Sequence, residues 1–186
     1  MTEHNIIHQD VIESNFNNIT DPRFELIKVG EIIVPENYNH ATQLSTIDPD
    51  DFAFFNYKLL CDKCFKKNTH ELQHSKKYVV GIFQTKPIVS REECVAFLSI
   101  QNALLVSAQG ESLLWQVNRE IFPLDIWTYS FDAVDALPID LKGGHNLPGL
   151  YRSSNGNHSF DLGRYEREYN VFNNFCFLCF NENEPQ

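Results

Sequence analysis

Short hydrophobic runs between turn residues predict several strands. Residues 24–34 (FELIKVGEIIV) and 78–84 (YVVGIFQ) are rich in Val, Ile and Phe, a composition typical of strands. Gly30 interrupts the first run and Pro35 follows it. Residues 24–34 therefore predict either two short strands or one bulged strand.

The second half of the chain combines strand patterns with a long stretch of turn residues. Trp127, Tyr129 and Phe131 fall on one side of a predicted strand over residues 125–131. Residues 132–160 contain two prolines and four glycines, which predict a long loop region, and loops of that length are often functional. Residues 170–180 (NVFNNFCFLCF) predict a terminal strand packed into the core.

Three segments have helical spacing. Asp residues at 48–51 followed by an apolar stripe predict a helix over about 50–66. Ser90 and Glu93 form a capping-box pattern at the start of a second helix, which Gly110 ends. A third helix is predicted over 111–121, before Pro123. The sequence around Gly110 also permits a hairpin that turns at this glycine.

Together these elements predict an α+β fold, with one compact domain over residues 21–186. Its sheet is expected to be small, mostly antiparallel and packed against two to four helices. Residues 1–20 are polar and Asn-rich, and we expect them to form an N-terminal arm. The 186 residues are 42% hydrophobic and include 15 Phe, enough for a sizeable core.

The charge distribution is uneven. The formal net charge is -10, which disfavours general binding to nucleic acid because phosphate backbones are repelled. Residues 58–77, however, carry six lysines against two acidic residues, a net charge of +4, so the rest of the chain carries -14. A lysine-rich segment of this kind is typical of a solvated helix face.

Neither a secretory signal nor an apolar run long enough to span a membrane is evident, so we expect a cytoplasmic protein with no membrane partner. The five cysteines form two C-x-x-C pairs plus Cys94, which suits a reducing compartment better than a disulfide framework.

The densest candidate chemistry is the sequence HELQH at residues 70–74, which resembles the active-site motif of zincin metallopeptidases over five residues. The resemblance implies that His70 and His74 bind zinc and that Glu71 is the general base. In the thermolysin-like branch of the family, a Glu on a following helix is the third ligand, which here points to Glu92 or Glu93.

The cysteines offer two structural alternatives to a catalytic zinc. Cys61 and Cys64 could join His70 and His74 in one site if the chain reverses direction between the pairs. Alternatively, Cys61 and Cys64 could join Cys176 and Cys179 in a four-thiolate site. The cofactor prediction is therefore either none or zinc.

Other candidate binding residues are His145 and Asn146, in a glycine-rich turn, and Trp127 and Tyr129, which could form an interface patch. No complete catalytic set or cofactor fingerprint accompanies them. We therefore expect a small acidic protein that binds another protein with a basic surface, as an inhibitor of the immunity or antitoxin type would. The alternatives are a zinc-dependent hydrolase that uses HELQH and an interaction module with a structural zinc site.

Overall fold

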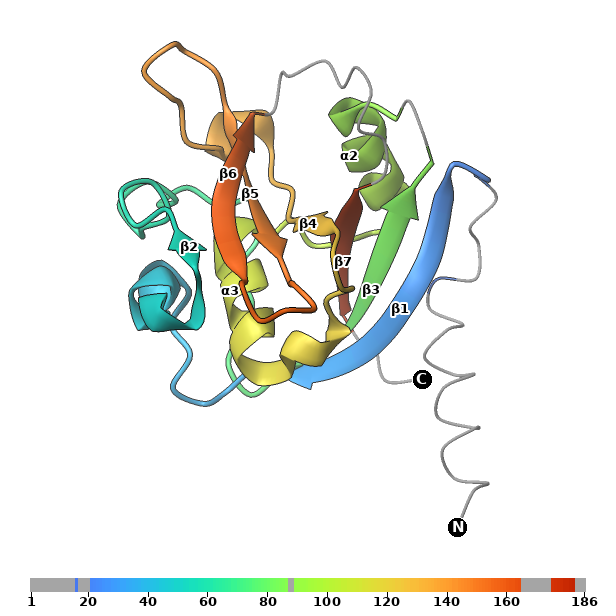
Figure 1. The fold of residues 1–186 in the computed structure, drawn as a ribbon. Helices are drawn as coiled ribbons and strands as arrows, with labels where there is room; N and C mark the ends of the chain where they lie inside the picture. The colour runs from blue at the N-terminus through green and yellow to red at the C-terminus, as the bar shows by residue number, and fades with distance from the viewer. Residues whose placement is uncertain (1–15, 17–20, 87–88, 165–174, 183–186) are drawn as a thin grey trace.

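The structure is a computed structural model that describes residue 16 and residues 21–86, 89–164 and 175–182 (Figure 1). Its strands are β1 (Phe24–Ile33), β2 (Phe54–Phe55), β3 (Lys77–Thr85), β4 (Trp127–Tyr129), β5 (Asn146–Tyr151), β6 (Ser159–Arg164) and β7 (Cys176–Glu182). Its α-helices are α2 (Arg91–Ile100) and α3 (Ser107–Asn118). Four short 3₁₀ segments are η1 (His40–Thr46), η2 (Pro49–Asp51), η3 (Arg119–Ile121) and η4 (Val134–Ala136). The predicted arm over residues 1–20 lies outside the described residues apart from Phe16.

The seven strands form one sheet in the order β1-β3-β7-β4-β5-β6-β2. Two neighbouring pairs, β4 with β7 and β2 with β6, are parallel, and the other pairs are antiparallel. The predicted α+β class and the mostly antiparallel sheet are confirmed. The prediction of a small sheet is wrong, because strands form in segments that were expected to be helix or loop.

Hydrophobic cores lie on both faces of this sheet, and β7 contributes to each of them. Cys176, Leu178 and Phe180 belong to a core shared with α3, whereas Phe177 and Cys179 belong to a core shared with α2. Side chains alternate between the two faces along a strand, so the FCFLCF sequence is apolar on both sides because both sides are covered.

Most of the predicted strands are confirmed. Residues 24–33 form one strand whose register shifts between Leu26 and Lys28, so the bulged strand is the correct alternative. β3 matches its prediction closely, and β4 is shorter than predicted. β7 covers the end of the predicted terminal strand, and residues 170–174 of that prediction lie outside the described residues.

The helix predicted over residues 50–66 is wrong. The chain there forms η2, the two-residue strand β2 and a series of turns. β2 pairs with β6, and Phe52 packs against Trp115 and Phe160 at ring-centroid distances of 5.2 and 5.9 Å. These contacts with distant parts of the chain replace the local helix, because tertiary packing outweighs a weak helical preference.

The predicted boundary between the two central helices is also wrong, and so is the alternative hairpin that turns at Gly110. Gly110 lies inside α3, where a Cβ would come within 2.1 Å of a methyl group of Val106. The break lies earlier, between α2 and α3, where the Leu104 N–H donates to the Phe180 carbonyl at 2.7 Å. The capping box at the start of α2 is confirmed, with Ser90 and Glu93 as predicted.

The single long loop predicted over residues 132–160 is wrong, because it contains β5 and the beginning of β6. Gly149 lies within β5, and this position requires a glycine because a Cβ there would come within 2.6 Å of the Tyr129 ring. Pro148, beside it, accepts a hydrogen bond through its carbonyl from the Ser130 N–H at 3.3 Å. Residues that usually mark a turn are here used inside a strand, where a neighbouring ring needs space.

Helix α3 carries a fully buried carboxyl group. Glu111 is 0% exposed, and neither of its oxygens makes a hydrogen bond of ordinary geometry with a described residue. Burial raises the pKa of Glu111 well above its ordinary value, although the nearby backbone N–H of Leu150 acts in the opposite direction. Burial therefore favours the neutral form of this carboxyl in the folded protein.

We predict that Glu111→Gln flattens the pH dependence of stability. Above the pKa of about 4.3 that Glu has in the unfolded chain, the unfolded state releases a proton that the folded state keeps. The free energy of unfolding of the wild type should then fall by up to about 1.4 kcal/mol per pH unit relative to Glu111→Gln.

Urea unfolding of both proteins at pH 5, 6 and 7 measures this difference. Val117→Ala, an exposed substitution on the same helix that changes no ionisable group, should keep the wild-type slope. Parallel curves for the wild type and Glu111→Gln would show that Glu111 is not protonated in the fold.

Candidate functional site

The HELQH segment is not helical: residues 70–73 have no regular secondary structure, and a turn begins at His74. The His70 N–H donates to the Leu105 carbonyl at 3.2 Å, and the Leu105 N–H donates to Nδ1 of His70 at 3.0 Å. Glu71 and His74 are exposed, whereas Leu72 between them is buried. Two histidines four residues apart share one face in a helix, and no helix forms here, so the geometry that the zincin resemblance implies is absent.

The hydrogen bond to His70 also fixes the state of its ring. Nδ1 accepts the bond from Leu105, so a neutral His70 carries its proton on Nε2. A metal bound at Nε2 would require that proton to move to Nδ1, which would break the bond to Leu105. His70 therefore acts in this structure as a cross-link between the HELQH segment and the segment before α3.

The third ligands suggested by the resemblance have other roles. Glu92 and Glu93 lie in the first turn of α2, and Glu92 is exposed. The carboxylate of Glu93 accepts a hydrogen bond from the Ser90 N–H at 2.8 Å and pairs with Arg23. The Ser90 N–H and the Arg23 guanidinium together lower the pKa of Glu93, which matches a charged capping residue.

The two C-x-x-C pairs are arranged differently from each other. Cys61 and Cys64 lie in a turn, with their sulfurs 4.0 and 3.8 Å from the Lys58 carbonyl. Cys176 and Cys179 are buried on opposite faces of β7. Burial raises the pKa of Cys176 to about 12. A zinc ligand must be a thiolate, so this burial works against zinc binding by Cys176.

Across the part of the chain that the structure describes, no three His, Cys, Asp or Glu side chains gather closely enough to hold a metal ion. Binding of zinc by any of the candidate residues stays a prediction.

A hydrogen-bonded loop carries two of the predicted binding residues, His145 and Asn146. We call residues 138–146 the tip loop, and it projects from the body of the protein next to β5 (Figure 1). Ile139 and His145 pair across it as an isolated β-bridge, and the Asn146 N–H donates to the Pro138 carbonyl at 2.8 Å. His145 and Asn146 therefore lie at the base of the loop and hold its two arms together.

The apex of the tip loop is held by one carboxylate. Oδ1 of Asp140 accepts hydrogen bonds from the N–H groups of Lys142 and Gly144 at 2.7 and 2.9 Å. Gly143, which has a φ of 81°, supplies the left-handed turn. Leu141 is fully exposed at 108% and Ile139 is 63% exposed, so the loop presents two apolar side chains to solvent.

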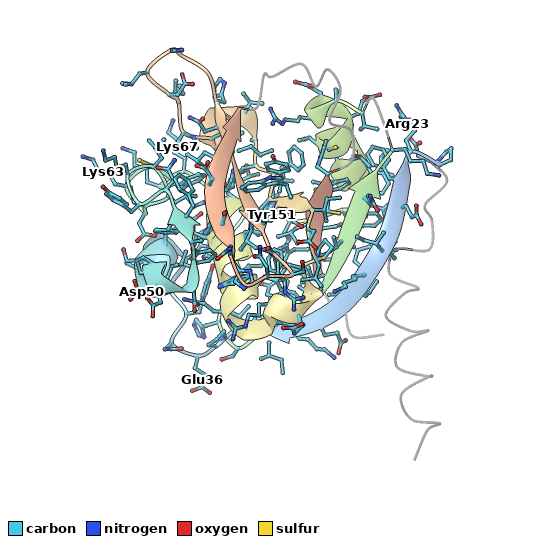
Figure 2. The ribbon with its side chains drawn as sticks, in the orientation of Figure 1. Arg23, Glu36, Asp50, Lys63, Lys67 and Tyr151 are labelled. Atoms are coloured by element: carbon cyan, nitrogen blue, oxygen red, sulfur yellow. The ribbon has the colours of Figure 1, made fainter. Side chains whose placement is uncertain are left out.

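The other two predicted binding residues form an aromatic row with Tyr151, which is labelled in Figure 2. Trp127 lies 6.3 Å from Tyr129 at an interplanar angle of 18°, and 5.5 Å from Tyr151. All three side chains are half-buried, and β4 and β5 pair Trp127 directly with Tyr151. The structure thus brings Trp127 and Tyr129 together as the sequence predicted.

Sequence reasoning missed Tyr151 and Leu141 because both lie in the segment that was read as loop. The available signal for Tyr151 was its type, because an aromatic residue next to Leu150 is typical of a strand. No sequence signal distinguished Leu141 from a buried leucine, because its exposure depends on the hydrogen bonds of Asp140.

Comparison of the chain with protein-family models, with curated proteins and with solved structures found no match. The fold therefore defines the class only as an α+β domain with one mixed, mostly antiparallel sheet. No helix within the described residues has the length and apolar character needed to cross a membrane.

We predict that His70 stabilises the fold through Leu105 rather than through a metal. His70→Ala should lower the free energy of unfolding by about 1–2 kcal/mol, because the Leu105 N–H loses its acceptor. The matched change His74→Ala removes an exposed ring and should cost less than about 0.5 kcal/mol. Chemical unfolding of the three proteins measures both effects.

Elemental analysis of the same proteins, purified without added metal, tests the zinc hypothesis directly. One equivalent of zinc in the wild type that is lost from both variants would contradict the purely structural role of His70 and would favour the zincin reading.

Proposed function

We propose that this protein acts by binding another protein, and that the tip loop is an anchor of the interface. The observation that carries the proposal is Leu141, a fully exposed leucine at the apex of a hydrogen-bonded, projecting loop. Surface leucines are common singly, but here the backbone is specifically organised to present one together with Ile139.

The hydrogen bonds within the loop reduce the cost of binding. A loop that is already ordered by Asp140 and by the Asn146 pairing loses little conformational freedom when a partner closes over it. Burial of one leucine side chain contributes about 1.5–3 kcal/mol. A rigid loop with an apolar tip therefore suits insertion into an apolar pocket of a partner.

The charge of the protein favours a basic partner. The formal net charge is -10, and the exposed residues Asp48, Asp50 and Asp51 cluster around η2. Figure 2 shows Asp50 on the outside of this part of the molecule. This negative charge attracts a basic partner during encounter, and it repels acidic partners and nucleic acid.

The specific form that we propose is an inhibitor of the immunity or antitoxin type, which would cover a basic active site. Its small size, its acidity and a preorganised loop support this form over a scaffold with no enzymatic partner. A hydrolase that uses HELQH has less support, because that segment is not helical and His70 is engaged with Leu105.

We predict that Leu141→Asp weakens partner binding by at least about tenfold, because the leucine would leave an apolar pocket and a charge would enter it. Ile100→Asp is the matched control, since Ile100 is 75% exposed on α2 and lies outside the tip loop. Affinity capture with tagged wild type and both variants, at low and high salt, followed by titration of the captured protein, measures the effect.

The expected partner is basic, is retained by Ile100→Asp, and is released by Leu141→Asp or by high salt. Capture that depends on neither Leu141 nor salt, or no captured protein with a basic surface, would overturn the proposal.

A further inference from the structure

A carboxylate lies beside Tyr151, one of the rings of the aromatic row. Oδ1 of Asp125 accepts a weak hydrogen bond of 3.5 Å from the Tyr151 hydroxyl and one of 3.0 Å from the Ser154 N–H. The Tyr151 ring lies 5.5 Å from the Trp127 ring, at an interplanar angle of 43°. We call Asp125, Trp127 and Tyr151 the aromatic corner.

The backbone holds Asp125 in an uncommon conformation. Its φ is 60°, in the left-handed region that few residues other than Gly, Asn and Asp adopt. The Asp125 N–H donates to the Arg152 carbonyl at 2.8 Å, which ties the turn to the end of β5. The hydrogen bond from the Ser154 N–H lowers the pKa of Asp125, so the exposed carboxylate is charged at neutral pH.

The arrangement has the components of a cation site. Oδ1 of Asp125 accepts the hydrogen bonds from the Tyr151 hydroxyl and the Ser154 N–H. Within the described residues, no cationic side chain lies over the rings of Trp127 or Tyr151. Tyr129, the third ring of the row, already has the Arg91 guanidinium 6.0 Å from its centroid. The same sheet face therefore contains one internal cation–π pair and, next to it, two rings that can form another.

We infer that the aromatic corner receives the guanidinium group of an arginine side chain from the partner protein. This inference rests on the proposed function and names the chemistry of the partner at a second contact point. A guanidinium is planar, stacks on aromatic faces and donates two parallel hydrogen bonds to a carboxylate. Trp127 and Tyr151 supply the faces, and Asp125 supplies the carboxylate.

Binding of a single arginine side chain can be tested without the partner. The probe is acetyl-arginine amide, and its isosteric neutral control is acetyl-citrulline amide. The chain has two tryptophans, so two indole N–H signals report separately on half-buried Trp127 and on Trp115, which is 2% exposed. A Trp127→Phe variant assigns the two signals.

We predict that the arginine probe shifts the Trp127 signal with a dissociation constant on the order of millimolar, and that the Trp115 signal does not move. Asp125→Asn keeps the shape of the side chain and should weaken the probe by at least about tenfold, because the charge-assisted hydrogen bonds are lost. Asp135→Asn, an exposed change outside the corner, should bind as the wild type does.

Three outcomes would overturn the inference: an equal shift with the citrulline probe, an unchanged affinity in Asp125→Asn, or equal binding of acetyl-lysine amide. The captured partner separates this inference from the proposed function. If the partner depends on Leu141 but binds Asp125→Asn as tightly as the wild type, the aromatic corner is not used and the tip loop still is.

Discussion

The pairing of β7 between β3 and β4 is the interaction on which the rest of the structure depends. On one side β7 forms a seven-residue antiparallel ladder with β3, and on the other side it meets β4 in a short parallel ladder. These two ladders join the antiparallel β1–β3 pair to the β4–β5–β6 part of the sheet. Because alternate residues of β7 enter different cores, one strand fixes the positions of both α2 and α3.

The long segment between β1 and β3, residues 34–76, depends on this sheet rather than on its own secondary structure. Side chains act as its caps and cross-links: the Asp62 carboxylate accepts from the Leu44 N–H at 2.9 Å, and Gln109 donates to the Phe65 carbonyl at 2.6 Å. Figure 2 places Lys63 and Lys67 together at one end of the segment and Asp50 toward the other. Both lysines are exposed as the sequence predicted, but Lys63 lies in a turn and Lys67 in an irregular stretch, and neither lies on a helix face.

Sequence patterns predicted the elements whose determinants are local. The Ser90–Glu93 capping box starts α2, and the apolar runs of β1, β3 and β7 give strands. The failures occur where a distant residue decides the structure. Gly149 looks like a turn residue until the ring of Tyr129 is known to occupy the space of its Cβ, and HELQH looks helical until His70 is known to pair with Leu105. Among the candidate binding residues, Trp127 and Tyr129 were predictable because strand alternation places them on one face, whereas Asp125 and Leu141 depend on turn geometry.

The tip loop and the aromatic corner lie at the two ends of the same strand. Asn146 closes the loop at the beginning of β5, and Tyr151 lies at its end, five residues later. At about 3.4 Å per residue, these ends are separated by roughly 17 Å. A protein interface of ordinary size buries about 800 Å² on each side and spans that distance. One partner can therefore contact an apolar tip and a charged aromatic corner at once, and β5 would set the spacing between the two contacts. An apolar anchor supplies affinity, a carboxylate beside aromatic rings selects for a cation, and a rigid strand between them requires the partner to present both groups at a matching separation.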